Sequence, residues 1–234
     1  MNRSVLITGG NRGIGRAISE AFLKAGDQVA VAHRSDDELP DALNLRCDVT
    51  DTAQVDAAFT AAEAAHGPVE VLVSNAGISR SAPLAAMTED QFSQVLDTNL
   101  TGAYRVARRA TRGMLRLRRG RMIFISSVMG GAGLQGAGNY AASKAGLVGL
   151  ARSIAREYAG YGITANLVAP GLVRTDMIEE MPEGMRRHLV DRTFLKRAAE
   201  PDEIAATVLW LAADGSRYIT GAEIPVDGGL RLGA

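Results

Sequence analysis

The stretch Thr8-Gly9-Gly10-Asn11-Arg12-Gly13-Ile14-Gly15 guides the interpretation of the whole chain. It follows an apolar run at 3–8 that predicts a short strand, and it precedes a segment of helical periodicity that ends at Gly26. Glycines let the backbone approach a phosphate closely, and the start of a helix offers free N–H groups to it. The spacing differs from G-x-G-x-x-G and is weak by itself. Its position between a strand and a helix favours a dinucleotide site over a plain turn.

Strands and helices alternate along the rest of the sequence. Further apolar strands are predicted at 28–32, 43–47, 69–73, 122–125, 163–168 and 222–226. Helices are predicted at 51–66, 88–117, from 138 to 159, and at 201–213, while 130–138 and 175–197 are predicted to be irregular. Short apolar strands joined by helical crossovers indicate a parallel sheet covered on both faces. We therefore expect an α/β fold, with residues 1–234 forming a single-domain, doubly wound (Rossmann) sheet of about seven strands and helices on both faces.

The composition is that of a globular protein. Of the 234 residues, 47% are hydrophobic and 22% are charged, which argues against a disordered or membrane-embedded chain. A single cysteine, Cys47, cannot form an internal disulfide, and the sequence contains no signal-peptide pattern and no long apolar run. We expect a cytoplasmic protein with no metal site and with neither nucleic acid nor a membrane as partner.

The segment Asn139-Tyr140-Ala141-Ala142-Ser143-Lys144 contains a phenol and an ammonium group four residues apart. In a helix these two side chains share one face. A neighbouring positive charge lowers the pKa of a tyrosine toward the range that is useful for proton transfer. The alternative is that Tyr140 is a half-buried helix residue and Lys144 a solvated one.

The residues after the second strand indicate which nicotinamide dinucleotide is bound. An acidic side chain at this place would bind the ribose 2′-hydroxyl of NAD, whereas arginine accommodates the 2′-phosphate of NADP. The sequence has His33-Arg34-Ser35 here, and Arg12 in the glycine-rich turn faces the same region. We predict NADP(H) rather than NAD(H). Alternatively, Arg34 is a solvated loop residue.

Taken together, several motifs resemble those of the short-chain dehydrogenase/reductase family. They are Thr8-Gly9-(x3)-Gly13-Ile14-Gly15, Asn75-Ala76-Gly77, Asn99, Ser127, Tyr140-(x3)-Lys144 and Pro170-Gly171. The resemblance covers nearly the whole chain. Within the family, the sequence is most similar to the β-ketoacyl-acyl-carrier-protein reductases, notably at 125–128, 139–146, 170–177 and from 219 to 229.

The resemblance implies a catalytic set of Asn99, Ser127, Tyr140 and Lys144. Tyr140 would protonate the carbonyl oxygen as hydride arrives, and Ser127 would hydrogen-bond that oxygen, with Ser126 as a rival. Lys144 would hold the nicotinamide ribose and lower the Tyr140 pKa. Asn99, in the long helix predicted at 88–117, would hold a water that links Lys144 to solvent. The chemistry is sound, because hydride addition puts negative charge on oxygen and a proton donor stabilises it.

The same resemblance implies the cofactor contacts. Asp48-Val49 would contact the adenine, Asn75-Ala76-Gly77 the ribose region, and Val173 and Thr175 the nicotinamide half. The full set of expected cofactor-binding residues is Gly9, Gly10, Asn11, Arg12, Gly13, Ile14, Gly15, His33, Arg34, Asp48, Val49, Asn75, Ala76, Gly77, Tyr140, Lys144, Pro170, Gly171, Val173 and Thr175.

Arginines dominate the stretch between Asp97 and Glu157, which contains no acidic residue although the formal net charge is zero. The spacing of Arg105, Arg109, Arg112, Arg116 and Arg119 predicts one helix face. An acidic acyl-carrier protein is one expected partner, docking at Arg116, Arg118, Arg119 and Arg121. A solvated face or a subunit interface are alternatives, and Tyr161 replaces a second basic docking residue of some relatives. The resemblance also implies a homotetramer.

The resemblance implies an enzyme. The expected reaction is NADPH-dependent reduction of a β-ketoacyl thioester on acyl-carrier protein to the β-hydroxyacyl thioester, in fatty-acid or dissociated (type II) polyketide biosynthesis. One alternative is a reductase or dehydrogenase of a free alcohol or ketone, and another is a non-catalytic NADP-sensing protein. Residues from about 176 to 196 would form a substrate lid. Its apolar residues would line an acyl groove or form the core of a small helix pair: Ile178, Met181, Met185, Leu189, Val190, Phe194 and Leu195.

Overall fold

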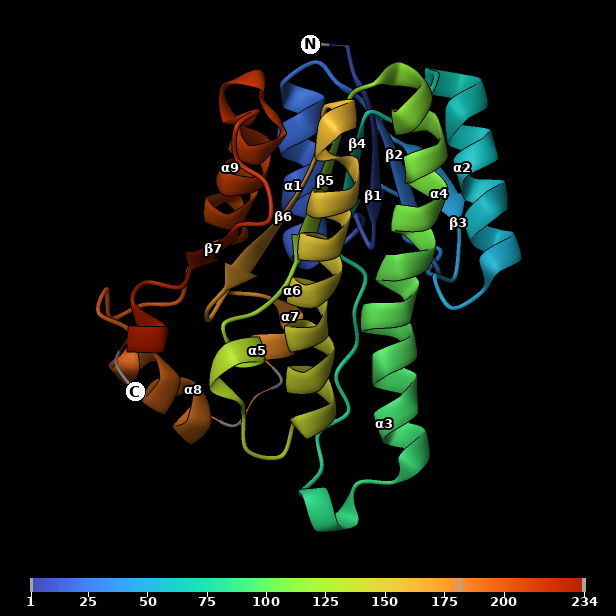
Figure 1. Cartoon of the computed structure of the whole chain (residues 1–234). Helices are drawn as coiled ribbons and strands as arrows, with labels where there is room; N and C mark the ends of the chain where they lie inside the picture. Colours follow the sequence, from blue (N-terminus) through green and yellow to red (C-terminus); the bar gives the residue numbers. More distant parts are fainter. Residues whose placement is uncertain (1, 180, 182, 233–234) are drawn as a thin grey trace.

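The computed structural model describes residues 2–179, 181 and 183–232. A seven-stranded, all-parallel sheet of order β3-β2-β1-β4-β5-β6-β7 organises them (Figure 1). The strands are β1 (Ser4–Thr8), β2 (Gln28–His33), β3 (Leu43–Arg46), β4 (Val71–Ser74), β5 (Gly120–Ile125), β6 (Ile163–Pro170) and β7 (Glu223–Val226). The strand order reverses between β1 and β4, so the crevice expected of such sheets opens at their carboxyl ends. The predicted fold class is confirmed.

Helices cover both faces of the sheet. On one face lie α1 (Gly13–Lys24) and α9 (Pro201–Ala212), and on the other lie α2 (Thr52–His66), α4 (Gly102–Leu117) and α6 (Gly138–Tyr158) (Figure 1). Each layer has its own apolar core, because residues of a strand point alternately to either face. Local signals set the helix ends: the Asp51 carboxylate accepts the backbone N–H of Ala53 at 2.8 Å and so caps α2.

The predicted helix at 88–117 is three elements rather than one. After α3 (Glu89–Leu96), one π-helical turn (Asp97–Thr101) precedes α4. Thr88 caps α3 in a capping box with Gln91. The prediction of a continuous α-helix is corrected at the π turn, a feature that has no periodic sequence signal and is frequent at functional sites.

Two regions predicted to be irregular contain short helices. The glycine-rich loop includes α5 (Met129–Ala132), and the region 175–197 includes α7 (Asp176–Glu179) and α8 (Glu183–Arg192). Mixed charges along α8 hide its periodicity. Leu189 is buried, whereas Met185, Phe194 and Leu195 are exposed, so these three are not core contacts of a helix pair. Single 3₁₀ turns occur at Leu84–Ala86, Ala159–Tyr161, Asp214–Ser216 and Leu230–Leu232.

Within the described residues, none of the helices combines the length and apolarity needed to cross a bilayer. The same residues contain no cluster of side chains suited to a metal ion. Cys47 is a buried free thiol after β3, and burial raises its pKa to about 11, which makes it a poor nucleophile at neutral pH.

Candidate active site

Ser127 and Tyr140 meet at the carboxyl edge of the sheet. Ser127 lies just beyond the end of β5, and Tyr140 lies in the first turn of α6. The Ser127 hydroxyl group lies close enough to the Tyr140 phenol to act on its pKa. Lys144 follows one turn later, with its Nζ 5.6 Å from the centroid of the Tyr140 ring. The i, i+4 spacing therefore brings the phenol and the ammonium group together, as the sequence predicted.

The pKa of Tyr140 shifts opposite to the sequence expectation. Burial of the phenol raises its pKa above the ordinary value, because a low-dielectric setting disfavours the phenolate. The Ser127 hydroxyl group acts on this pKa in the opposite direction. The lowering that we expected from Lys144 does not contribute to the Tyr140 pKa in this structure, and Tyr140 is held as a neutral proton donor.

Lys144 is buried and its ammonium group points back toward the sheet. Its Nζ donates a 2.7 Å hydrogen bond to the backbone carbonyl oxygen of Ile125, the last residue of β5. Burial lowers the Lys144 pKa to about 8. A lysine in this state is an adjustable charge beside Tyr140 rather than a solvated surface group.

The π turn places Asn99 beside Lys144. The Asn99 Oδ1 accepts the backbone N–H of Ile78 at 2.8 Å, and its Nδ2 donates to the Ile78 carbonyl oxygen and the Ser143 Oγ, both at 3.0 Å. A Cβ atom on Gly77 would lie 3.3 Å from the Asn99 Oδ1 and 3.6 Å from the Lys144 Nζ. The two side chains therefore converge beside a glycine that leaves space between them. The water-relay role of Asn99 remains a proposal.

Ser126 and Ser127 have different surroundings. The Ser126 Oγ is buried and donates to the backbone carbonyl oxygen of Lys144 at 3.3 Å. The Ser127 Oγ faces Tyr140 and accepts the backbone N–H of Met129 at 3.2 Å. Adjacent residues of an extended chain point to opposite sides, so Ser126 is directed away from Tyr140 and Ser127 toward it.

The glycine-rich turn is too tightly packed for side chains. Gly9 has a φ of +63°, and a Cβ on Gly15 would lie only 2.0 Å from the Gly9 carbonyl oxygen. The Asn75 Nδ2 donates to the carbonyl oxygens of Thr8 and Gly9 at 3.1 and 3.0 Å, which ties the end of β4 to the turn. The Thr175 methyl group lies 3.5 Å from a Cβ position on Gly13. Three distant segments thus form one cradle, which fits a dinucleotide at the start of α1.

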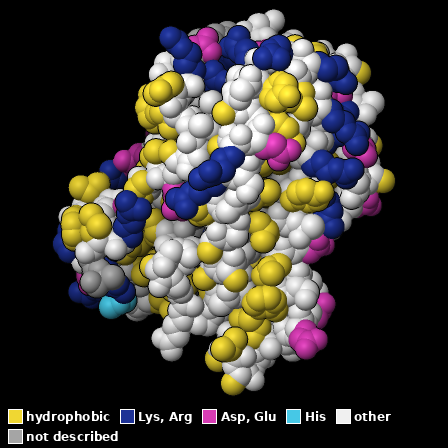
Figure 2. Space-filling model, in the orientation of Figure 1, with side chains coloured by type: hydrophobic (Ala, Val, Ile, Leu, Met, Phe, Trp, Pro, Cys, Tyr) yellow, Lys and Arg dark blue, Asp and Glu magenta, His cyan; other side chains and the backbone are white. Residues whose placement is uncertain are grey.

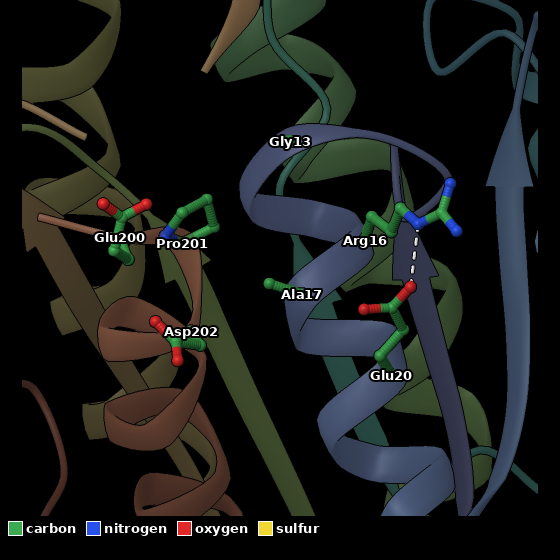
Figure 3. Close-up of a pocket in the computed structure, with 7 residues that line it drawn as sticks. All are labelled: Gly13, Arg16, Ala17, Glu20, Glu200, Pro201 and Asp202. Atoms are coloured by element: carbon green, nitrogen blue, oxygen red, sulfur yellow. Dashed lines mark hydrogen bonds and ion pairs between the residues drawn. The ribbon is translucent and has the colours of Figure 1, made fainter. Parts of the chain in front are cut away.

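A hollow of about 490 Å³ lies on the outer side of this turn, between α1 and α9 (Figure 3). Figure 3 shows Arg16 turned toward Glu20, and the two form a 2.7 Å ion pair. The hollow is lined by Gly13, Arg16, Ala17, Glu20, Glu200, Pro201 and Asp202. Three carboxylates make it unsuited to phosphate, so the cradle of Asn75 and Thr175 is the better place for an anionic cofactor.

A family model described as enoyl-(acyl carrier protein) reductase matches residues 9–231, almost the whole chain. The chain belongs to the short-chain dehydrogenase/reductase family. It is 52% identical to the 3-oxoacyl-(acyl-carrier-protein) reductase MabA of Mycobacterium bovis, over 100% of this chain and 94% of the relative. The same enzyme of Mycobacterium avium is 48% identical, over 100% of this chain and 91% of the relative. The reductase FabG of Salmonella typhimurium is 39% identical, over 97% and 96%.

In this short-chain dehydrogenase/reductase, the predicted cofactor-selecting residues His33, Arg34 and Ser35 lie at the carboxyl end of β2, whose last residue is His33. The Arg34 Nη1 forms a 3.1 Å ion pair with the Asp48 carboxylate, and both side chains remain accessible. Burial raises the Asp48 pKa, but hydrogen bonds from Thr50 and the pair with Arg34 hold it below its ordinary value overall. Val49 is buried against Gly102 of α4, so its side chain serves the core.

The end of β6 is another tightly packed part of the site. A Cβ on Gly171 would lie 2.8 Å from the Cα of Asp227, so this position requires glycine. Pro170 is the last residue of β6, and the buried Val173 forms an isolated bridge with Ala199. These contacts fix the backbone from which Thr175 reaches the glycine-rich turn.

Sequence reasoning gave no role to two buried polar residues beside Tyr140. The Asn139 Nδ2 donates to the carbonyl oxygens of Arg80 and Gln91, at 2.9 and 3.2 Å, and its Oδ1 accepts the Tyr140 N–H at 2.7 Å. The Ser143 Oγ donates to the Tyr140 carbonyl oxygen at 2.7 Å. The available sequence signal for such a role was a pair of polar residues flanking a tyrosine on a helix of mostly small residues. The partners of Asn139 could not be predicted, because Arg80 and Gln91 are far away in sequence.

Proposed function

We propose that this chain reduces the β-keto group of an acyl thioester carried on acyl-carrier protein to the β-hydroxyacyl thioester, using NADPH, in fatty-acid or type II polyketide biosynthesis. The observation that carries the proposal is the juxtaposition of the Ser127 hydroxyl and the Tyr140 phenol, with the buried Lys144 beside them, at the carboxyl edge of β5. Two hydroxyl groups that meet at one point suit a substrate oxygen that gains negative charge. The relatives named 3-oxoacyl-(acyl-carrier-protein) reductase support this substrate class.

The residues of this chain account for the proton side of the reaction. When bound, the nicotinamide supplies the hydride. Ser127 hydrogen-bonds the ketone oxygen and Tyr140 donates its phenolic proton to that oxygen, so the product is an alcohol. Lys144 holds positive charge beside the resulting phenolate, and we propose that Asn99 holds the water through which Tyr140 is reprotonated. The raised Tyr140 pKa favours the neutral donor before reaction.

The cofactor preference rests on the residues after β2. Arg34 is accessible beyond the strand, and Arg12 is exposed at the start of α1. No acidic residue lies at 33–35, where a carboxylate would repel a 2′-phosphate. The Asp48 carboxylate partly neutralises the charge of Arg34 in this structure. A 2′-phosphate would compete with Asp48 for the guanidinium group. NADPH is therefore proposed over NADH.

Carrier docking is proposed at the C-terminal end of α4, at Arg116, Arg118 and Arg119. In the space-filling view of Figure 2, Lys and Arg side chains gather over the upper part of the molecule. Arg118 is exposed and lies over the Tyr161 ring, 5.3 Å from its centroid. Arg119 lies beyond the end of α4 and forms ion pairs with Glu70 and Asp214, which reduces its share of the charge.

One part of the sequence expectation about these arginines is wrong, and two members of the predicted helix face are paired within the chain. Arg121 lies within β5 and is buried, so it cannot contact a carrier protein. Arg105 and Arg109 pair with acidic residues of the same chain, Asp97 and Glu63, at 2.8 and 2.7 Å. The unpaired positive charge of the predicted arginine face is therefore concentrated at the C-terminal end of α4. Residue-spacing arguments miss such pairs because the carboxylates come from α2 and the π turn.

The proposed docking site and the active site of one chain lie at opposite edges of the sheet. Tyr140 is at the carboxyl edge, whereas Arg118 follows the C-terminal end of α4, which has 16 residues and so spans about 24 Å (Figure 1). A carrier bound at Arg118 would serve a second chain more easily than its own. Docking there is consistent with the proposed homotetramer, in which neighbouring chains supply sites to each other.

The test is a substrate panel with both dinucleotides. We expect turnover of a β-ketoacyl-carrier substrate with NADPH, much slower turnover with NADH, and little with a trans-2-enoyl-carrier substrate. The enoyl substrate is included because of the description of the matching family model. Preference for the enoyl thioester or a free ketone would overturn the substrate assignment. NADPH binding without turnover of any substrate would instead indicate a sensor.

A further inference from the structure

The segment 75–80, which follows β4 and passes beside α6 (Figure 1), is bonded to three parts of the candidate active site. Its start is tied to the glycine-rich turn, and its middle, Ile78, is tied to Asn99. Its end is tied to α6, because the Asn139 Nδ2 donates to the Arg80 carbonyl oxygen at 2.9 Å. The cofactor cradle, the π turn and the helix that carries the phenol therefore share one backbone segment as a common frame.

Three hydrogen bonds fix the orientation of the Asn139 amide, which is fully buried. Its Oδ1 accepts the backbone N–H of Tyr140 at 2.7 Å, and its Nδ2 donates to the carbonyl oxygens of Arg80 and Gln91. Exchanging the amide nitrogen and oxygen would lose all three hydrogen bonds. The side chain therefore joins the first turn of α6 to the segment after β4 and to α3.

The Tyr140 N–H depends on this side chain. The helix α6 begins at Gly138, and N–H groups in the first turn of a helix have no carbonyl of the same helix to bond. Ala137, at the N-cap position, has no polar side chain that could accept them. Asn139 takes over the cap from inside the helix, and the other end of its amide leaves the helix for Arg80. It therefore also fixes where the Tyr140 backbone lies relative to the segment after β4.

The Tyr140 carbonyl oxygen is connected to the same segment. It accepts a 2.7 Å hydrogen bond from the Oγ of Ser143, which is buried. The same Oγ accepts the Asn99 Nδ2 at 3.0 Å, and this Nδ2 also donates to the Ile78 carbonyl oxygen. Both backbone polar groups of Tyr140 thus lead to the segment 75–80 through buried side chains.

We propose that Asn139 is a positioning residue, which sets the Tyr140 phenol relative to the bound cofactor by tying the Tyr140 backbone to the segment 75–80. Hydride and proton must reach the two atoms of one carbonyl group, so the proton donor and the cofactor cradle need a fixed mutual position. A misplacement of about 1 Å can lower a rate by about 10²-fold. The inference rests on the proposed ketone reduction and adds a residue that acts through Tyr140.

The test is the single-turnover rate of a β-ketoacyl substrate at saturating NADPH. We expect Asn139→Ala to lower this rate by about 10–10²-fold and to leave the Kd of NADPH within about twofold, because the cradle keeps its own contacts. Asn166→Ala is the matched control. Asn166 is a buried asparagine of β6 whose Nδ2 donates to the Ile219 carbonyl oxygen at 2.8 Å and whose Oδ1 accepts the Ala222 N–H at 3.1 Å. The control should lose similar thermal stability and keep the wild-type rate.

A solvent isotope effect separates a misplaced proton donor from a loss of folded enzyme. A smaller folded fraction lowers the amount of active enzyme and leaves the isotope effect unchanged. A displaced phenol slows proton transfer, so the isotope effect of D₂O on the single-turnover rate should be larger in Asn139→Ala than in the wild type. An unchanged isotope effect in a slow Asn139→Ala enzyme would overturn the inference, and so would a matching loss of rate in Asn166→Ala.

Asn139→Ser separates the tether from the cap and serves as the milder variant if Asn139→Ala does not fold. The serine hydroxyl ends one atom closer to the backbone, so it can bond within the helix but does not span to Arg80. We expect Asn139→Ser to be as slow as Asn139→Ala. A wild-type rate in Asn139→Ser would show that local capping is sufficient and would overturn the tether.

Amide hydrogen exchange tests the same contact without substrate. In the ligand-free protein, exchange of the Tyr140 N–H should be about tenfold faster in the Asn139 variants, as loss of one hydrogen bond predicts, and unchanged in Asn166→Ala. Unchanged exchange in the Asn139 variants, or loss of NADPH binding together with the rate, would overturn the inference. A wild type that reduces no carbonyl substrate would overturn the proposed function instead, and amide exchange would still decide whether Asn139 holds Tyr140.

Discussion

The Nζ atom of Lys144 donates a 2.7 Å hydrogen bond to the backbone carbonyl oxygen of Ile125 and so joins α6 to the last residue of β5. This bond brings together the two elements that carry Tyr140 and Ser127. The fixed relation between strand end and helix start keeps the two hydroxyl groups at one point while the lysine charge stays buried beside them. Removal of the Tyr140 hydroxyl, the Ser127 hydroxyl or the Lys144 ammonium group should each have a different, measurable effect.

Tyr140→Phe is expected to lower the rate of ketone reduction by about 10²–10⁴-fold, because the proton donor is lost and the ring volume is kept. NADPH binding should change little. Single-turnover kinetics and fluorescence titration of NADPH check the two parts. An active Tyr140→Phe enzyme would exclude the phenol as the general acid.

Ser127→Ala should lower kcat by about 10²-fold, since a hydrogen bond to the developing oxyanion is lost. Ser126→Ala is the matched control, because its hydroxyl bonds to the Lys144 backbone rather than to Tyr140. We expect the control to keep kcat within about twofold and to lose about 1 kcal/mol of stability. Equal losses of kcat in both variants would contradict the assignment of Ser127.

Lys144→Met tests the buried charge through stability. Burial lowers the Lys144 pKa to about 8, whereas the unfolded chain keeps the ordinary value of 10.5. Between these values the unfolded state binds more protons than the native state, so wild-type stability rises with pH through this window. Relative to Lys144→Met, the wild type should gain about 2 kcal/mol between pH 7.5 and 9.5 in urea unfolding. A constant difference would show that the lysine titrates normally.

Gly15→Ala should abolish dinucleotide binding and destabilise the fold, because the added Cβ would lie 2.0 Å from the Gly9 carbonyl oxygen. Gly215→Ala is the control: its Cβ meets no atom within 4 Å and needs no unusual φ. Thermal unfolding and NADPH titration should separate the two variants clearly. Full binding by Gly15→Ala would mean that the turn can open at no cost.

Arg118→Glu combined with Arg119→Glu should raise the KM for a carrier-bound substrate by at least about tenfold, while turnover of a small thioester without carrier stays the same. Charge reversal opposes an acidic partner and leaves the distant Tyr140 untouched. Lys24→Glu, an exposed reversal at the end of α1, serves as control. An unchanged KM in the double variant would remove this surface as the docking site.

Several features followed from the sequence because they depend on neighbours along the chain. Strand and helix periods, the Asp51 and Thr88 caps and the glycine-rich turn are local patterns, and together they define a doubly wound sheet. The i, i+4 relation of Tyr140 and Lys144 is equally local, since one helical turn brings them together.

Other features needed the tertiary structure because they depend on residues far apart in sequence. The π turn aligns Asn99 with Ile78, and burial reverses the expected shift of the Tyr140 pKa. The fold buries Arg121, an expected docking residue, within β5. The acceptors that hold the Asn139 amide come from Arg80 and from Gln91 on α3. Burial, desolvation and cross-element hydrogen bonds arise only once distant segments meet, and no spacing within one segment encodes them.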